Sequence, residues 1–294
     1  MRTYLECYPC FLRQALDGAR LAGADEQQQR DILERVLDLL KSAPLTLVPP
    51  AIGQRVHGIV RDETGVPDPY QAVKERSTRE ALALYPWLRG IVAEADDGLE
   101  TAVRLSIAGN IIDMGPNPTY DLRDEVKRVL KEPLAIDDSG ALGDSLRDAR
   151  TVLYLADNAG ETVFDRVLIE AIEARVIYAV KGHPIINDAT AEDARAAGVG
   201  QVAEVMNNGS DSPGTLLEGC SDEFRRTYQE AEIIIGKGQA NYETLGEEGS
   251  RVFFLLQTKC PVIARDVGKP VGSLIVHQGQ DNGPGRGYEK ERGL

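Results

Sequence analysis

Asp157 and Asn158 are the residues of this sequence whose type and position point most directly to chemistry. They follow an apolar, β-branched segment and precede a turn through Gly160 that opens a helical stretch. Carboxylate and carboxamide oxygens are ligands that Mg²⁺ and Mn²⁺ prefer, and a helix start offers N–H groups to an anion. Aspartate and asparagine are also good helix caps, so the local sequence leaves a metal site and a structural cap equally open.

Polar residues also follow the next three predicted strands, at the edge where open parallel α/β sheets bind their ligands. Asp188 comes after the second strand, and Ser210 and Asp211 lie in a loop after the third. Lys237 stands between two glycines after the fourth, where its ammonium could meet a phosphate. We expect Asp188 to complete a metal site with the first pair, because adjacent strand ends lie close together. Helix capping by Asp188 and ordinary turn chemistry in the Ser210 loop stay open as alternatives.

Two further pairs lie in the helical half of the chain. Asn110 and Asp113 are three residues apart, so a helix would place both toward one pocket, although solvated residues show the same spacing. Cys7 and Cys10 have the spacing of a metal or redox motif. A structural zinc site needs two more ligands, and neither the other cysteines nor the three histidines supply a matching pair. We therefore favour an inert or auxiliary role for these two cysteines.

The elements that must position these residues change in character along the chain. Residues 1–130 show helical periodicity, and we expect an N-terminal all-helical subdomain there. Residues 131–278 are expected to form a metal- and phosphate-binding domain, and residues 279–294 a flexible tail. Short β-branched segments alternating with helical stretches predict an α/β fold, a three-layer αβα, Rossmann-like structure with a mostly parallel sheet. Its predicted strands are residues 151–156, 175–180, 202–206, 233–235, 252–256 and 274–276.

Composition narrows the classes of protein to consider. The chain has 294 residues and a formal net charge of -14, which opposes general attraction to nucleic acid. No apolar segment approaches the roughly 20 residues of a membrane span, and the N-terminus lacks the pattern of a secretory signal. Four cysteines are too few for a disulfide scaffold in a chain of this length. We expect a cytoplasmic protein without nucleic-acid or membrane partners, and leave a homo-oligomer open.

Taken together, these segments resemble the damage-control phosphatase family, first catalogued as domain of unknown function 89. The resemblance spans roughly residues 1–278, and the cysteine pair is similar to that of the smaller prokaryotic branch. The motifs that carry it are Cys7-x-x-Cys10, Gly109-Asn110-x-x-Asp113, Asp157-Asn158-Ala159-Gly160-Glu161, Pro184 to Asp188, Gly209-Ser210-Asp211-x-Pro213-Gly214-Thr215 and Gly236-Lys237-Gly238.

The resemblance implies hydrolysis of small phosphorylated metabolites, such as sugar phosphates or damaged phosphometabolites. It implies a divalent ion, Mn²⁺, Co²⁺, Ni²⁺ or Mg²⁺, held by Asp157, Asn158 and Asp188. A water activated by this ion would attack in line, and covalent attack by Asp157 stays open. We expect these three residues and Lys237 to be catalytic. The expected substrate-binding residues are Glu161, Asn110, Asp113, Ser210, Asp211 and Lys237, with Glu161 either on the substrate side or behind the metal ligands.

Two other classes of function stay open on the sequence. An S-adenosylmethionine-dependent carboxyl methyltransferase would have a similar sheet and has been proposed for related proteins, but the first strand lacks a glycine-rich adenosine turn. No Walker or dinucleotide fingerprint is present either. The other class is a non-catalytic regulator that depends on a metal or on the thiols of Cys7 and Cys10.

Overall fold

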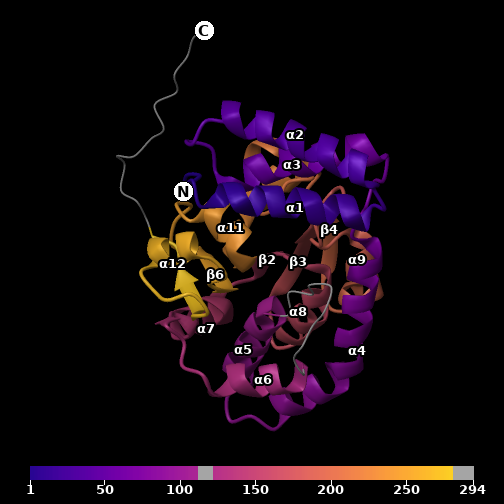
Figure 1. Cartoon of the computed structure of the whole chain (residues 1–294). Helices are drawn as coiled ribbons and strands as arrows, with labels where there is room; N and C mark the ends of the chain where they lie inside the picture. Colours follow the sequence, from indigo (N-terminus) through magenta and orange to yellow (C-terminus); the bar gives the residue numbers. More distant parts are fainter. Residues whose placement is uncertain (112–121, 281–294) are drawn as a thin grey trace.

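The computed structural model describes residues 1–111 and 122–280, built around a central seven-stranded sheet (Figure 1). The strand order is β1-β7-β6-β5-β2-β3-β4, and every neighbouring pair is parallel except β6 and β7. The predicted α/β fold with a mostly parallel sheet is therefore confirmed. The strands are β1 (Ile136–Asp137), β2 (Thr151–Leu155), β3 (Arg175–Val180), β4 (Glu204–Asn207), β5 (Ile233–Lys237), β6 (Val252–Gln257) and β7 (Leu274–Gln278).

The sheet departs from the predicted strands at its edge strands β4 and β1 and at β7, which lies beside β1. The third strand, predicted over residues 202–206, runs from Glu204 to Asn207, because Val202 caps the 3-10 turn of residues 199–201. β1 is only two residues long and was not predicted. β7 runs antiparallel to β6 because the chain turns back beside the strand it has just left, where Gly272 N–H donates to Thr258 O over 2.8 Å. The presence of β1 and the direction of β7 thus follow from tertiary contacts that a local pattern does not contain.

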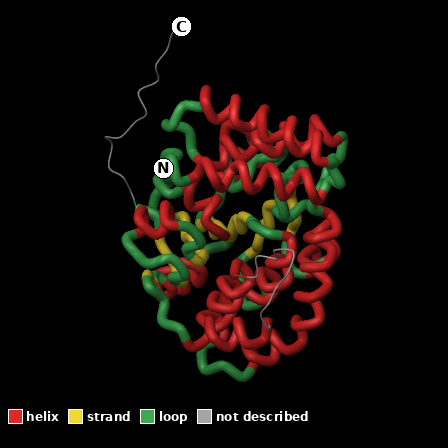
Figure 2. The backbone as a smooth tube through the Cα atoms, in the orientation of Figure 1, coloured by secondary structure: helices red, strands yellow, loops and turns green. Residues whose placement is uncertain are grey.

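Helices cover both faces of the sheet, as the red helices around the yellow strands in Figure 2 show. Helices α4 to α9 share a buried core with one face, and α10, α11 and α12 share one with the other. Among the described residues no helix is long and apolar enough to cross a membrane. The helices are α1 (Cys7–Leu21), α2 (Glu26–Ser42), α3 (Pro49–Thr64), α4 (Gln71–Ala93), α5 (Gly98–Ile111), α6 (Leu122–Lys131), α7 (Ser139–Asp148), α8 (Thr162–Ile169), α9 (Ala191–Ala196), α10 (Asp222–Glu230), α11 (Gly238–Leu245) and α12 (Pro261–Val267).

Helices α1, α2 and α3 form a separate layer, seen side by side at the top of Figure 1. Their apolar faces bury one another around Phe11, Ile32 and Val56. The N-terminus of α2 is fixed by a capping box between Asp25 and Gln28. Helices α4 to α6 instead pack on the sheet, so the core crosses the expected boundary near residue 130. The division into domains stays a prediction. Helices α1 to α3 have a core of their own, whereas the later helices share theirs with the sheet.

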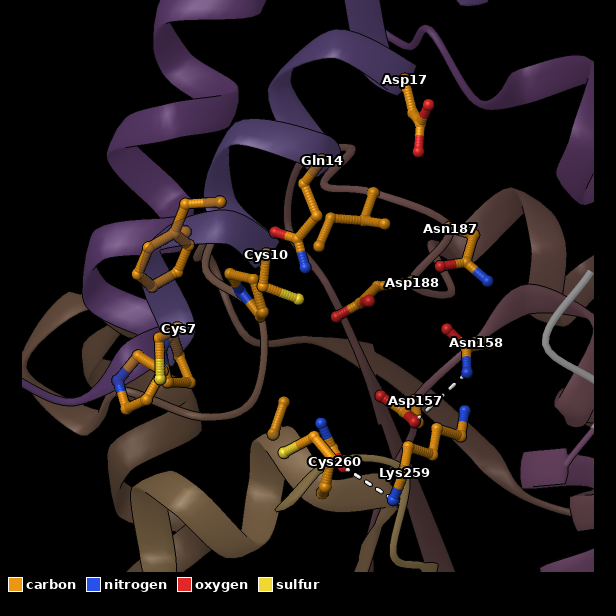
Figure 3. Close-up of a pocket in the computed structure, with 18 of the residues that line it drawn as sticks. Cys7, Cys10, Gln14, Asp17, Asp157, Asn158, Asn187, Asp188, Lys259 and Cys260 are labelled. Atoms are coloured by element: carbon orange, nitrogen blue, oxygen red, sulfur yellow. Dashed lines mark hydrogen bonds between the residues drawn. The ribbon is translucent and has the colours of Figure 1, made fainter. Parts of the chain in front are cut away.

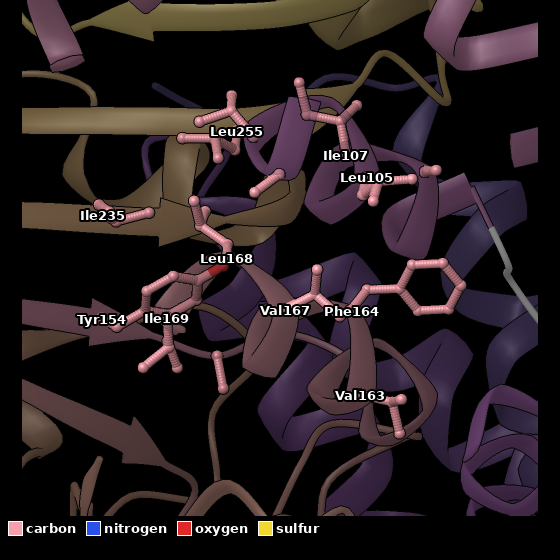
Figure 4. Close-up of a cluster of buried hydrophobic side chains, with 14 of the residues drawn as sticks. Leu105, Ile107, Tyr154, Val163, Phe164, Val167, Leu168, Ile169, Ile235 and Leu255 are labelled. Carbon is pink, nitrogen blue, oxygen red and sulfur yellow. The ribbon is translucent and has the colours of Figure 1, made fainter. Parts of the chain in front are cut away.

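The contact between α5 and α8 sets the position of Asn110. A Cβ atom at Gly109 would lie 2.9 Å from the Cβ atom of Phe164, so only glycine allows the two helices to approach this closely. Figure 4 shows Phe164 and Val167 of α8 near Leu105 of α5, within the buried cluster that continues to the sheet. This close packing carries Asn110 to the carboxyl end of β2.

Candidate active site

Two segments that follow β2 and β3 are joined by backbone hydrogen bonds at the carboxyl edge of the sheet. Ala159 N–H donates to Asn187 O and Ala189 N–H donates to Asp157 O, each over 2.8 Å. These bonds place Asn158 and Asp188 opposite one another in an isolated antiparallel bridge. The side chains of Asp157, Asn158 and Asp188 are thus brought together by main-chain contacts, as the strand-end argument predicts.

Asp157 lies at the centre of this group and is almost fully buried. Its Oδ2 atom accepts hydrogen bonds from Asn110 Nδ2 at 2.9 Å and from Asn158 Nδ2 at 3.3 Å. Gly238 has φ +72°, and a Cβ atom there would collide with the Asp157 carboxylate. The Gly236-Lys237-Gly238 segment therefore provides room for a carboxylate, which is a structural reason for its second glycine.

A buried network of charged and polar groups lies behind these residues. The Lys237 side chain is completely buried, and its ammonium donates to Asp165 at 2.8 Å and to Glu161 and Ser106 O at 3.0 Å. Glu161 in turn accepts hydrogen bonds from Asn110 and Asn158. Burial alone would lower the pKa of Lys237, but Asp165 and Glu161 raise it above its usual value. Lys237 is therefore charged, and it holds Glu161 in place.

Electrostatics in this region favour an additional cation. The carboxylates of Asp157, Glu161, Asp165 and Asp188 are buried close together. Lys237 lies between Glu161 and Asp165, Lys181 lies beside Asp188, and Lys259 acts on Asp157, so acidic groups outnumber these basic ones. Burial, with repulsion from neighbouring carboxylates, raises the pKa of Asp157 well above its usual value. Burial likewise raises the pKa of Asp188 to about 6. A divalent cation would remove this crowding of like charge.

One oxygen of Asp188 lacks a hydrogen bond. Asp188 Oδ2 lies 3.4 Å from Lys181 Nζ, an ion-pair separation, but the geometry makes no hydrogen bond and the atom is buried. Such atoms are rare in native proteins, and a bound ion is one explanation. Within residues 1–111 and 122–280 no group of three or more His, Cys, Asp and Glu side chains is arranged as a metal site. The set here comprises two aspartates and an asparagine, which suit a hard cation.

A cavity of about 740 Å³ opens above these residues. Asp157, Asn158, Asp188 and Lys259 line its floor, whereas residues of α1 and α3 form the opposite side (Figure 3). The separate layer of α1 to α3 therefore covers the site. Lys259 also lies close enough to Asp157 that its charge lowers the pKa of that carboxyl group, against the larger effect of burial.

Several residues predicted to bind substrate lie away from the cavity. Asn110, Glu161 and Lys237 are behind its floor, fully or almost fully buried, and engaged with one another. The structure thus corrects the expectation that Lys237 meets a phosphate, because buried carboxylates already surround its ammonium. In this arrangement these three residues support Asp157 and Asn158.

Ser210 and Asp211, both predicted to bind substrate, make structural contacts in the loop after β4. Asp211 accepts hydrogen bonds from Gln54 and Arg61 of α3, so it joins the loop to the layer above the cavity. Ser210 Oγ accepts from Ser212 N–H at 3.1 Å, within its own loop. Neither residue is among those that line the cavity. Asp113 lies outside the described residues.

Sequence reasoning missed Lys259 and Asp165. Lys259 follows the end of β6 by two residues, so the same rule that identified Asp157 would have found it. The residues around that strand end include no glycine and no acidic residue, the types that distinguish the other strand ends. Asp165 lies inside α8 and gives no local signal, although its side chain is one of the two carboxylates that hold Lys237.

Comparison with known proteins identifies the family. The family model described as the damage-control phosphatase ARMT1-like domain matches residues 3–275. The chain belongs to this family. It is 36% identical to a damage-control phosphatase of Archaeoglobus fulgidus over 282 residues, covering 92% of this chain and 96% of that protein. It is likewise 36% identical to damage-control phosphatase PH1575 of Pyrococcus horikoshii over 283 residues, covering 94% and 97%.

A solved structure shares the fold as well as the sequence. The crystal structure of the Pyrococcus horikoshii protein, a DUF89 family member, matches with a TM-score of 0.88 and 34% identity. The match covers 95% of this chain and all of that one. The region matched by the family therefore includes the α1 to α3 layer, the sheet and every described residue of the site.

Replacing Lys237 by methionine is expected to destabilise the protein strongly. The substitution leaves Glu161 and Asp165 buried without their counter-charge, which costs about 3–5 kcal/mol of unfolding free energy. Urea denaturation followed by circular dichroism measures this loss. Lys41→Met is the control, because Lys41 is exposed and pairs with Asp38 on the surface, and its effect should stay within about 0.5 kcal/mol. Equal stability of Lys237→Met and the wild type would contradict a structural role for this ammonium.

Proposed function

We propose that this protein hydrolyses small phosphate monoesters, such as sugar phosphates or damaged phosphometabolites, with the help of a divalent metal ion. The observation that carries the proposal is the convergence of Asp157, Asn158 and Asp188 on a cavity floor, with Asp188 Oδ2 lacking a hydrogen bond. The names of the two relatives as damage-control phosphatases support a phosphatase of this class. Mn²⁺, Co²⁺, Ni²⁺ and Mg²⁺ are all compatible with such oxygen ligands.

Each residue of the floor has a distinct role in this proposal. Asp157 and Asp188 would supply carboxylate oxygens and Asn158 its amide oxygen to the metal. When bound, the ion would polarise a phosphoryl oxygen and acidify a water. The amide nitrogen of Asn158 is committed to Asp157 and Glu161, so its oxygen is the atom left to face the ligand (Figure 3). Lys237 acts at a distance by holding Glu161.

Lys259 is the residue that we assign to the phosphate. It lines the cavity floor with the three proposed metal ligands, and its charge acts on Asp157. An ammonium at this position offsets the charge on the phosphoryl oxygens during the reaction. We favour water as the nucleophile, because Asp157 Oδ2 is already held by two hydrogen bonds and packs against Gly238.

The rest of the cavity suits the organic part of a small ester. Its volume lies within the roughly 300–1,000 Å³ of small-molecule sites, far more than a phosphate group needs. Gln14 on α1, Asn187 and Gln239 line it and offer amide donors and acceptors. These groups match the hydroxyls of a sugar or a similar polar metabolite.

Metal removal and replacement of the aspartates test the reaction directly. Hydrolysis of p-nitrophenyl phosphate and of a sugar-phosphate panel should stop with EDTA and return with excess Mn²⁺. Asp157→Asn and Asp188→Asn should each lower kcat/KM by more than about 100-fold, since each replaces an anionic metal ligand by a neutral one. Asp38→Asn is the control, because Asp38 is an exposed residue of α2. Undiminished hydrolysis in EDTA would contradict the metal, and a wild type inactive with every metal and substrate would contradict the phosphatase.

Replacing Lys259 separates its role from that of Lys237. Lys259→Met should lower kcat by about 10²–10³-fold, because a positive group facing the reacting phosphoryl oxygens is lost. Its urea midpoint should stay close to that of the wild type, unlike that of Lys237→Met. Steady-state kinetics under saturating Mn²⁺, with Lys41→Met as control, measure the effect. An unchanged kcat in Lys259→Met would remove this residue from the proposed reaction.

A further inference from the structure

Arg76 of α4 is an arginine that lines the cavity and has no partner among the described residues. Val73, one turn earlier on the same face of the helix, lines the cavity as well. The Arg76 side chain is half-buried, and its Nε atom is buried without a hydrogen-bond partner. Buried donors without a partner are rare in native proteins. The guanidinium of Arg76 therefore has donors available for a ligand in the cavity.

Contacts of the neighbouring residues hold this part of α4 beside the proposed metal ligands. A Cβ atom at Gly160 would lie 2.9 Å from the Cβ atom of Ser77, so the helix packs directly on the turn that follows those ligands. Thr78 Oγ1 also donates to Ala159 O at 3.4 Å. Arg76 immediately precedes these two contacts on the helix. Its backbone therefore has a defined position relative to the cavity floor.

The start of α4 lies on the β3 side of the sheet. Lys74 Nζ of α4 is 2.7 Å from Asp68 and 3.0 Å from Asp193, and Asp193 belongs to α9, the helix that follows β3. Lys259 follows β6, and the strand order places β3 and β6 on opposite sides of β2. Figure 1 shows the same separation, with α4 beside α9 at the right and α12 at the left. Arg76 and Lys259 therefore approach the residues after β2 from opposite sides.

Arg20 of α1 also lines the cavity, but its charge is screened. Arg20 lies 4.0 Å from Asp17, and its side chain is 59% exposed. Exposed charges of this kind contribute little to binding, because water and the ion-pair partner compete for them. The guanidinium of Arg76 is half-buried and has no carboxylate to compete for it, so it interacts more strongly with an anion in the cavity.

We propose that Arg76 binds a second anionic group of the substrate, a carboxylate or a second phosphate, at the end of the molecule away from the phosphate that is hydrolysed. This inference rests on the proposed phosphatase function, in which the metal ion and Lys259 hold the reacting phosphate. A guanidinium presents a planar fork of donors that fits the oxygens of a carboxylate or of a phosphate. The preferred substrate is therefore a phosphate monoester that carries two anionic groups.

The distribution of charge around the cavity fits such a molecule. Lys259 is the base that lowers the pKa of Asp157 most, so its ammonium acts at the metal end of the cavity. The cavity of about 740 Å³ has room for a short carbon chain between that end and Arg76. An anionic group at Arg76 accepts the unused hydrogen bonds and compensates the charge, whereas a neutral hydroxyl leaves the charge uncompensated.

Titration calorimetry with phosphonates tests this subsite on the full-length protein loaded with Mn²⁺. Butylphosphonate has one anionic group, γ-phosphonobutyrate adds a carboxylate, and tetramethylenebisphosphonate adds a second phosphonate. None of the three has an ester bond to hydrolyse. The wild type should bind at least one doubly anionic probe at least about tenfold more tightly than butylphosphonate, because a charge-assisted hydrogen bond is gained. The tighter of the two doubly anionic probes identifies the second group that the site prefers.

Substitutions on α4 assign the preference to Arg76. Arg76→Met should lose the preference and keep the wild-type affinity for butylphosphonate, which also shows that the variant is folded. Arg76→Lys should keep part of the preference, because lysine retains the charge without the planar fork. Arg79→Met is the matched control, because Arg79 is exposed on the same helix and is not among the residues that line the cavity. All three affinities of this control should stay close to those of the wild type.

The possible failures are distinguishable. Equal binding of the three probes by the wild type, or a preference that persists in Arg76→Met, would overturn the subsite. Weaker binding of butylphosphonate by Arg76→Met would also overturn it, because Arg76 would then contact the first phosphonate. Hydrolysis of p-nitrophenyl phosphate tests the proposed function separately. An inactive protein that still distinguishes the probes through Arg76 keeps the subsite and loses the reaction, and a protein that binds no probe loses both.

Discussion

The compensation of buried negative charge is the constraint on which the rest of this structure depends. Four carboxylates, those of Asp157, Glu161, Asp165 and Asp188, lie within one region of the protein interior. Lys237 lies between Glu161 and Asp165 at the back, Lys181 lies beside Asp188 at the front, and Lys259 acts on Asp157. Burying an unpaired charge costs so much free energy that buried carboxylates are normally paired with a basic group or bound to a metal ion. A divalent cation would offset the excess of acidic groups, which links the architecture of the core to the chemistry proposed for the cavity.

The sequence predicted the front of the site better than the back. Asp157, Asn158 and Asp188 follow strands, so the topology of a parallel sheet alone brings them together. Lys237 obeys the same rule, yet its side chain turns inward because Glu161 and Asp165 attract it. Side-chain direction depends on partners distant in sequence, and a strand-end pattern does not contain them. Asp165 in the middle of α8 is the clearest case.

The fold was predictable in its centre and less so at its edges. Buried strands such as β5, with three consecutive isoleucines, carry their own signal, whereas the two-residue β1 does not. The α1 to α3 layer was predicted as helical, but its position above the cavity follows from tertiary contacts such as that between Arg61 and Asp211.

Anomalous diffraction from crystals grown with Mn²⁺ tests the central claim most directly, because it locates the metal without reference to activity. The account predicts a single strong peak at the cavity floor, within ligand distance of Asp157, Asn158 and Asp188, with Lys237 still paired to Glu161 and Asp165. No peak at this position in crystals saturated with Mn²⁺, or a peak bound elsewhere while these side chains stay unchanged, would contradict it.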